Sequence, residues 1–350
     1  MRAAVVLEPG RLEIVDVPDP VPGPYQVKLR TLAAGICGTD RHIIEGTFYR
    51  SDYPAILGHE SVGEVVELGS AVRNFKPGDM VLRTYAARPG ERLGPYASML
   101  GSFADWTLAT DTIAQAADGR EAEIKPYDRM HKIVPPGFDP IDAGAFIALK
   151  ETLSWLRRLT DVSGKRVLIV GTGPAGLAFV QVAKLLGAAQ VVVLGRREGR
   201  LAHARRVGAD AAVSASAAEL PELLRELTDG RGIDVAIEAA GTVDILEAIP
   251  DGLARGGIIG VYGISNGQSA TLRWGWNRPT PRTWSLRFEE PDEAGIHDEA
   301  LELVRTGRFQ PKSILTHVIP FAQIGGVLQV MGREEACKVA IDFRDTAVPR

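Results

Sequence analysis

The chain has 350 residues, of which 45% are hydrophobic and 24% are charged, and its formal net charge is −4. A chain of this length is expected to form two domains, each with its own core. The mildly acidic balance argues against nucleic acid or a membrane surface as partner, and no apolar run is as long as a transmembrane helix. Two cysteines cannot build a disulfide framework, so we expect a protein of the reducing cytoplasm.

The first 150 residues predict an all-β region. Short apolar runs separated by Gly and Pro are typical of strands, and they lie at residues 1–10, 12–17, 27–32, 61–68 and 80–82. Residues 111–127 are polar and irregular, so we expect an exposed loop there.

Residues 166–176 carry the most informative pattern. The run Arg-Val-Leu-Ile-Val at 166–170 predicts a buried strand, Gly-Thr-Gly-Pro-Ala-Gly follows at 171–176, and a helix is predicted at 177–186. Such glycines let the backbone approach a pyrophosphate closely, and the helix start offers free N–H groups. An ordinary glycine turn is the alternative, but the order strand, loop, helix favours dinucleotide binding. The residues predicted to contact the cofactor here are Gly171, Gly173, Pro174, Ala175 and Gly176.

The chain after this loop alternates strands and helices, which predicts a doubly wound parallel sheet. Predicted strands lie at 190–194, 234–241 and 257–262, and predicted helices at 200–207, 217–227 and 243–253. The tail predicts a helix at 298–304, a strand at 314–321, a helix near 322–331 and a strand at 338–343.

The end of the second predicted strand of this sheet indicates which dinucleotide is bound. An acidic residue there would accept a hydrogen bond from the ribose 2′-OH of NAD, but the chain has Gly195, followed by Arg196 and Arg197. Glycine removes the repulsion of a 2′-phosphate, and arginines can pair with it. NADP is therefore favoured over NAD. Alternatively, the two arginines only begin a solvated helix.

Two short motifs in the first part carry further chemistry. Residues 35–42 read Gly-Ile-Cys-Gly-Thr-Asp-Arg-His, and residues 58–60 read Gly-His-Glu. Cys37, His59 and Glu60 are competent zinc ligands, and a metal would polarise a carbonyl or alcohol oxygen. The spacing alone leaves open that Cys37 is a small buried side chain and His59 a hydrogen-bonded core histidine.

Together these motifs resemble the medium-chain dehydrogenase/reductase superfamily, in its zinc alcohol and polyol dehydrogenase branch. The resemblance runs over nearly the whole chain, and the Lys-Pro-Gly-Asp turn at 76–79 is also similar to the family. It implies an α/β protein with two domains. Residues 152–297 would form a Rossmann-type dinucleotide-binding domain, and residues 1–151 with 298–350 a mainly β, GroES-like catalytic domain.

The resemblance also implies roles for the motif residues. Cys37 and His59 would be zinc ligands, with Glu60 beside the metal. Thr39 would hydrogen-bond the substrate oxygen, because a hydroxyl both donates and accepts. His42 would pass the proton to solvent, since its ordinary pKa suits a relay near neutral pH. Asp40 would orient His59.

Alternatives to these roles remain open. Thr39 and Asp40 could instead cap a helix, and His42 could simply be exposed.

The chain departs from the family at two places. Residues 83–100 lack the four cysteines that hold a structural zinc in many relatives, so that zinc is not expected. The family's third catalytic ligand stands 24 or 25 residues before the first glycine of the nucleotide loop, where this chain has Ile147 and Phe146. Either Glu151 or Glu60 would then be the third ligand, or the site holds no zinc, since catalytic zinc usually takes three protein ligands.

The expected function is an NADP-dependent oxidoreductase that transfers a hydride between nicotinamide and a secondary alcohol or ketone, with a polyol or sugar as plausible substrate. One alternative is a zinc-free reductase of an activated C=C or imine bond. Another is a non-catalytic NADP-binding sensor. The resemblance further implies a homodimer or homotetramer, formed by edge pairing of the nucleotide-domain sheet near residues 257–262 and the segment that follows.

Overall fold

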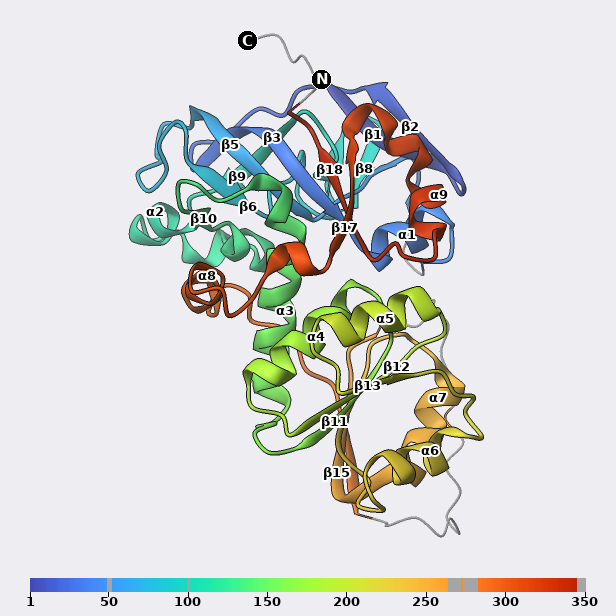
Figure 1. The fold of residues 1–350 in the computed structure, drawn as a ribbon. Coiled ribbons are helices and arrows are strands. Elements are labelled where there is room, and N and C mark those ends of the chain that lie inside the picture. Colours follow the sequence, from blue (N-terminus) through green and yellow to red (C-terminus); the bar gives the residue numbers. More distant parts are fainter. Residues whose placement is uncertain (49–51, 100, 264–271, 273–282, 345–350) are drawn as a thin grey trace.

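The computed structural model describes residues 1–48, 52–99, 101–263, 272 and 283–344. The chain folds into two lobes (Figure 1). One lobe is built mostly of strands and contains both ends of the described chain, and the other is built around a parallel sheet covered by helices.

The mainly β lobe contains two sheets. The first has five strands in the order β2-β1-β4-β8-β7: β1 (Arg2–Glu8), β2 (Arg11–Asp16), β4 (Ala55–Ile56), β7 (Arg92–Leu93) and β8 (Tyr96–Ser98). The second runs β10-β6-β5-β3-β18-β17, with β9 also paired to β3: β3 (Gln26–Ile36), β5 (Glu60–Leu68), β6 (Met80–Leu82), β9 (Trp106–Thr110), β10 (Ile133–Val134), β17 (Leu315–Pro320) and β18 (Lys338–Asp342). The C-terminal strands thus return to the sheet of the N-terminal lobe.

The other lobe contains a six-stranded sheet, all parallel, in the order β13-β12-β11-β14-β15-β16. Its strands are β11 (Arg166–Val170), β12 (Gln190–Leu194), β13 (Ala211–Val213), β14 (Ile233–Glu238), β15 (Leu253–Val261) and β16 (Trp284–Arg287). This order is the doubly wound dinucleotide-binding topology. The predicted fold class, a doubly wound sheet joined to a mainly β domain, is confirmed.

Alternating residues of β11 fill cores on both faces of this sheet. Val167 and Ile169 pack with α4 (Pro174–Leu185). Leu168 and Val170 pack on the opposite face with α6 (Leu220–Leu227) and α7 (Val243–Ala248). Burial on both faces explains why the sequence of this strand is apolar throughout rather than alternating.

The remaining helices cover and join the lobes. α3 (Ala143–Leu159) packs on β3 and β5 of one lobe and on α4 of the other. The others are α1 (Gly38–Ile44), α2 (Thr112–Ala117), α5 (Glu198–Arg206), α8 (His297–Arg305) and α9 (Val327–Gly332). Since α3 spans both lobes, side chains on it can face residues of either one.

Three sequence-based expectations of local structure were wrong. Residues 111–127 are not an irregular loop, because Asp111 caps α2 by accepting from the Ala114 N–H, and 3₁₀ turns follow at Glu121–Glu123 and Pro126–Met130. The helix predicted at 243–253 ends at Ala248, where the 3₁₀ turn Ile249–Gly252 contains Pro250. The helix predicted near 322–331 begins as the 3₁₀ segment Phe321–Gly326 and becomes α-helical only in α9.

The edge of the parallel sheet also differs from expectation. β15, which contains most of residues 257–262, hydrogen-bonds β14 on one side and β16 on the other, so it is internal. Among the described strands, β13 and β16 lie at the two edges of this sheet. Most of the segment between them, residues 264–271 and 273–282, lies outside the described residues.

Candidate active site

Cys37 stands between the end of β3 and the start of α1. It caps the helix, since its Sγ accepts from the Thr39 N–H at 3.2 Å. Asp40 completes a capping box, because its Oδ2 accepts from the Cys37 N–H at 2.9 Å. The cap fixes the direction in which the Cys37 thiol points. Asp40 therefore has the helix-capping role that the sequence analysis left open as an alternative.

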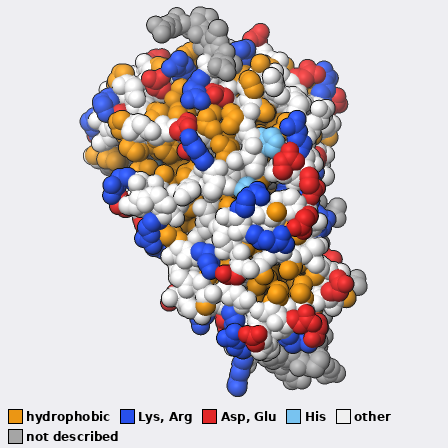
Figure 2. All heavy atoms as spheres, viewed as in Figure 1, with side chains coloured by type: hydrophobic (Ala, Val, Ile, Leu, Met, Phe, Trp, Pro, Cys, Tyr) orange, Lys and Arg blue, Asp and Glu red, His pale blue; other side chains and the backbone are white. Residues whose placement is uncertain are grey.

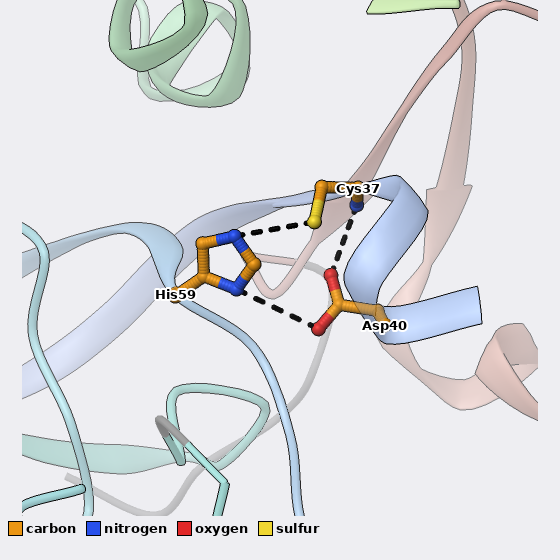
Figure 3. A group of neighbouring side chains, drawn as sticks. All are labelled: Cys37, Asp40 and His59. Atoms are coloured by element: carbon orange, nitrogen blue, oxygen red, sulfur yellow. Dashed lines mark hydrogen bonds and ion pairs between the residues drawn. The ribbon is translucent and has the colours of Figure 1, made fainter. Parts of the chain in front are cut away.

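His59 lies opposite Cys37, just before β5 (Figure 3). Its Nε2 lies 3.2 Å from the Cys37 Sγ, and its Nδ1 lies 3.7 Å from the Asp40 Oδ1. Burial opposes the charged imidazolium, but negative charge at Cys37 and Asp40 outweighs it and raises the pKa of His59 to about 10. Burial also raises the pKa of the Asp40 carboxyl. Asp40 therefore contacts both the helix cap and His59.

Thr39 and His42 lie on α1 beside this cluster. Thr39 is half-buried, and His42 is half-buried with its Nδ1 3.0 Å from the Thr47 hydroxyl. Both residues are reachable by solvent. The N-cap of α1 is Cys37 and not Thr39.

Glu60 follows His59 but points to a different partner. Its carboxylate forms a buried ion pair with the Lys338 ammonium of β18. The side chains of Glu60 and Lys338 are 4% and 1% exposed, so the pair is shielded from water. Gly35 and Gly144 make room for it, because a Cβ on either would meet Glu60 Oε2 or the Lys338 side chain within 3.2 Å.

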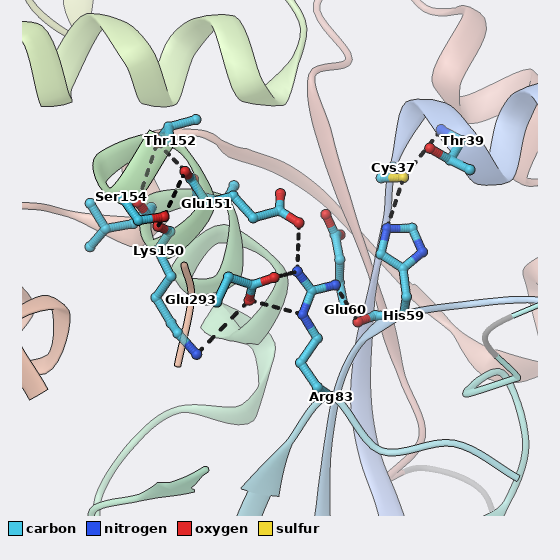
Figure 4. A network of polar contacts seen from close by, with 12 residues as sticks. Cys37, Thr39, His59, Glu60, Arg83, Lys150, Glu151, Thr152, Ser154 and Glu293 are labelled. Carbon is cyan, nitrogen blue, oxygen red and sulfur yellow. Dashed lines mark hydrogen bonds and ion pairs between the residues drawn. The ribbon is translucent and has the colours of Figure 1, made fainter. Parts of the chain in front are cut away.

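Glu151, on α3, is held by Arg83, which follows β6, and by Tyr262, which follows β15. Figure 4 shows the contact with Arg83. Oε1 of Glu151 accepts from Arg83 Nη2 at 2.5 Å, and Oε2 accepts from the Tyr262 hydroxyl at 3.2 Å. Burial would raise the pKa of the Glu151 carboxyl, but the positive charges of Arg83 and His59 lower it. The side chain is thus an anion beside the Cys37–His59 pair.

Arg83 joins the two parts of this network. Its Nη1 donates to the His59 carbonyl at 2.8 Å, and its Nε donates to Glu293 Oε2 at 3.0 Å. Lys150 Nζ lies 3.9 Å from Glu293 and has no hydrogen-bond partner within the described part of the chain. Burial lowers the pKa of Lys150 to about 8. The two cations Arg83 and Lys150 therefore balance the two carboxylates Glu151 and Glu293.

The donor set fits a zinc ion in part. Cys37 Sγ and His59 Nε2 face each other, and Asp40 stands behind His59, as a carboxylate does behind many metal-bound imidazoles. Cys37, Asp40 and His59 have potential ligand atoms within 4.8 Å of one another. Phe146 and Ile147, at the family's usual third position, are fully buried and apolar. The carboxylate that lies with Cys37 and His59 in the described structure is that of Asp40. Glu60 and Glu151, the third ligands expected from the sequence, are each in an ion pair instead.

The glycine-rich loop lies at the carboxyl end of β11, in the lobe opposite Cys37. Gly171 has a φ of 115°, which disfavours any side chain, and Pro174 is in the first turn of α4. A Cβ on Gly176 would lie 2.0 Å from the Gly171 carbonyl oxygen. Gly173 and Ala175 are half-buried, so the loop backbone stays within reach of a ligand.

Gly195 and the arginines after it lie at the end of β12. A Cβ on Gly195 would lie 2.5 Å from Thr172 Cγ2, so Thr172 occupies the space next to this position. Arg196 is exposed, and Arg197 is half-buried with a 3.3 Å hydrogen bond to the Arg333 carbonyl. Burial and then repulsion from Arg197 and Arg41 lower the pKa of Arg200, whose Nε has no partner among the described residues. The region is thus positively charged.

Sequence reasoning missed several residues of this network. Lys338 carried a signal, since a lysine at the start of the apolar strand 338–343 is unusual and indicates a buried charge partner. Arg83 follows β6 and has a φ of 64°. In the sequence, its position at the end of a predicted strand is the one signal that could have identified it as a site residue. Nothing local distinguishes Tyr262 or Glu293.

The distribution of charge on the surface and the length of the helices agree with the mixed charge and moderate hydrophobicity of the sequence. Figure 2 shows acidic and basic side chains interspersed over the viewed face. Among the described residues, no helix combines the length and apolarity needed to cross a bilayer.

Comparison with protein families identifies two consecutive matches. Residues 23–116 match the alcohol dehydrogenase GroES-like domain, and residues 174–278 match the zinc-binding dehydrogenase domain. The two matches together cover more than half of the chain.

Individual relatives share nearly the full length. A sorbitol dehydrogenase of Halalkalibacterium halodurans is 28% identical, over 95% of this chain and 96% of that protein. A zinc-type alcohol dehydrogenase-like protein of Escherichia coli K12 is 30% identical, over 92% of both. The crystal structure of a putative zinc-binding dehydrogenase from Sinorhizobium meliloti 1021, bound to NADP, has the same fold, with a TM-score of 0.78, 24% identity, and coverage of 97% of this chain and 98% of that one.

Proposed function

Because this chain belongs to the medium-chain dehydrogenase/reductase superfamily and is an NAD(P)-dependent dehydrogenase of the alcohol and polyol type, we propose that it uses NADP to interconvert a secondary alcohol and its ketone. The proposed substrate is a small polyol or sugar. The observation that carries this proposal is the pairing of Cys37 Sγ with His59 Nε2 at 3.2 Å, with Asp40 behind the imidazole.

The proposed mechanism divides the work among residues of α1 and the loop before β5. Cys37 and His59 would hold a zinc ion with Glu60 or Glu151, and the ion would stabilise negative charge on the substrate oxygen. Asp40, whose Oδ1 lies 3.7 Å from His59 Nδ1, would orient the imidazole. Thr39 holds the proton of the substrate hydroxyl, and half-buried His42 delivers it to solvent. The glycine-rich loop before α4 would hold the dinucleotide, which would supply or take up the hydride of the carbinol carbon.

The preference for NADP rests on the end of β12. Gly195 has no side chain that could repel a phosphate. Exposed Arg196 and half-buried Arg197 supply positive charge next to it. A 2′-phosphate would pair with these guanidiniums and would offset the repulsion that Arg200 receives from Arg41 and Arg197.

Substitution of Cys37 tests the metal role. In purified wild-type protein we expect zinc close to one ion per chain. Cys37→Ser should lose most of the zinc, and its activity should fall at least as much as the roughly 10- to 100-fold drop seen when residues behind metal ligands are removed. NADP(H) affinity should be retained. Cys337→Ser is the matched control and should keep the zinc, because this second cysteine is buried and its Sγ donates to the Thr172 carbonyl of the other lobe. Full activity in metal-free wild-type protein would contradict the zinc mechanism.

A specific observation favours a second candidate function. Glu60 and Glu151 are both neutralised by cations, Lys338 and Arg83, and the usual third-ligand position is apolar. A zinc-free reductase of an activated C=C or imine bond would leave these ion pairs intact, with half-buried His42 as proton donor, because the Lys150 side chain is fully buried. This function becomes the leading one if chelated protein keeps its activity and reduces such bonds with NADPH.

We also propose that the protein assembles as a homodimer or homotetramer. In the described residues β16 ends the strand order of the parallel sheet, and an edge strand is the usual place for pairing between chains. Phe288, directly after this strand, is 70% exposed.

A further inference from the structure

Glu151 has a place in the site that metal binding does not explain. It stands one helical turn after Ile147 on α3 and therefore faces the same side of the helix. Figure 4 shows its side chain pointing from α3 toward Cys37 and His59. Arg83 balances its charge, and Tyr262 fixes its second oxygen.

Exposure separates Glu151 from the charged residues around it. Its side chain is 22% exposed, whereas those of Arg83 and Glu293 are 3% and 4% exposed and that of Lys150 is fully buried. Glu151 is therefore the member of this cluster that a small molecule can reach. Arg83, Glu293 and Lys150 form a fixed support beneath it.

The carboxylate of Glu151 has capacity for another donor. An ionised carboxylate offers about four acceptor positions, and the described structure uses one from Arg83 and one from Tyr262. Each of the two contacts holds one oxygen of the carboxylate, so its orientation is fixed. A hydroxyl arriving from the exposed side would find an ionised acceptor already held in position, which lowers the cost of ordering it.

The position of Glu151 between the two lobes indicates which hydroxyl of the substrate would reach it. Tyr262 directly follows β15, at the carboxyl edge of the parallel sheet, where dinucleotides bind in this topology. Cys37 and His59 lie on the other lobe. A substrate with its reacting oxygen at Cys37 and His59 and its hydride directed to the sheet edge would place a neighbouring hydroxyl toward Glu151.

We infer that Glu151 is a specificity-determining residue that accepts a hydrogen bond from a second hydroxyl of the substrate, next to the reacting carbon. This assignment rests on the proposed alcohol oxidation and narrows its substrate class to vicinal diols, the unit found in polyols and sugars. A site built around such an acceptor discriminates against a substrate that lacks the hydroxyl. It also leaves Glu60 as the carboxylate available to a metal.

The test compares 2,3-butanediol with 2-butanol, which differ by one hydroxyl. The wild-type enzyme should have the higher kcat/KM for the diol. In Glu151→Gln the ratio of the two kcat/KM values should fall by about 10- to 100-fold, the range for losing a hydrogen bond to a charged group, mainly through KM for the diol. The ratio does not depend on the fraction of folded enzyme, so partial loss of protein leaves the result interpretable.

Glu293→Gln is the matched control, because Glu293 pairs with the same arginine but is buried. Its ratio should equal that of the wild type. Zinc content and NADPH affinity are measured for each variant, and both should be unchanged in Glu151→Gln.

The possible failures are distinct. An unchanged ratio in Glu151→Gln overturns the assignment and leaves the proposed alcohol oxidation standing. Loss of zinc together with equal loss on both alcohols makes Glu151 a metal ligand and also overturns it. A wild-type enzyme that binds NADP(H) but oxidises neither these alcohols nor any of a panel of polyols and sugars refutes the proposed function and this assignment with it.

Discussion

At the scale of single residues, the site is organised by pairs whose members are far apart in sequence. Glu60 and Lys338 are separated by 278 positions, and Arg83 and Glu293 by 210. Each pair neutralises a carboxylate that would otherwise be buried alone, which is costly. The polar side chains near Cys37 are therefore held in fixed positions before any ligand enters.

The arginines after β12 give a prediction at this scale. Arg196→Ser should weaken NADP(H) binding by about 10- to 100-fold, because a charge-assisted phosphate contact is lost, while NAD(H) binding changes little. Titration of both cofactors into the variant measures this. Arg225→Ser removes an exposed arginine of α6 and serves as control.

Tighter binding of NADH than NADPH by the wild-type protein would refute the cofactor preference. Substitution of Gly195 by Asp is a poor test, since even a Cβ there would lie 2.5 Å from Thr172 Cγ2.

At the scale of elements, the segment from α2 to β10 is anchored by buried polar residues of its last turn. Asp128 is fully buried and accepts from the Tyr85 hydroxyl at 2.6 Å. His131 Nδ1 accepts from the Thr110 N–H at 2.8 Å. Hydrogen bonds thus hold residues of the 3₁₀ turn Pro126–Met130 and the residue after it against β9, and Tyr127 reaches the His59 carbonyl at 3.4 Å.

His131 makes the anchoring of this segment sensitive to pH. Burial lowers its pKa to about 4 from an ordinary 6.5. Between these values the unfolded chain binds a proton that the folded chain does not. Stability from this group is therefore complete above pH 6.5 and falls on acidification, by up to about 1.4 kcal/mol per pH unit.

His131→Asn keeps an acceptor for the Thr110 N–H and should show a shallower loss of stability between pH 7 and 5. Urea unfolding at several pH values, followed by circular dichroism, measures it. The same pH dependence in variant and wild type would contradict the assignment.

Much of the element pattern was predictable, and the reasons are local. Residues 166–186 contain an apolar strand, a glycine turn and an apolar helix in order, and the structure has β11 and α4 there. The 111–127 region was missed because its hydrogen bonds reach back to Arg73 and Asn74, more than thirty residues away. Cys37 and His59 were named from their motifs, whereas the ion pairs of Glu60 and Glu151 depend on β18 and β6, which no local pattern connects to them.

At the scale of the whole molecule, the position of β16 at an edge of the described parallel sheet gives a prediction on assembly. The wild-type protein should be larger than the 37.6 kDa single chain in light scattering at micromolar concentration. Phe288→Glu places a charge beside the edge strand and should shift the protein toward the single chain without unfolding it. A wild-type protein that stays at 37.6 kDa would exclude edge-to-edge assembly.

The position of Trp155 on α3, beside Tyr262, has an optical consequence. The Trp155 indole is buried, donates to the Glu289 carbonyl at 2.9 Å, and packs edge-on against Tyr262 with ring centroids 5.4 Å apart. Reduced nicotinamide absorbs light in the range where tryptophan emits. Quenching of the emission from Trp155 would therefore report occupancy of the sheet edge beside Tyr262 without an added label, and Trp155→Phe would identify its share of the signal.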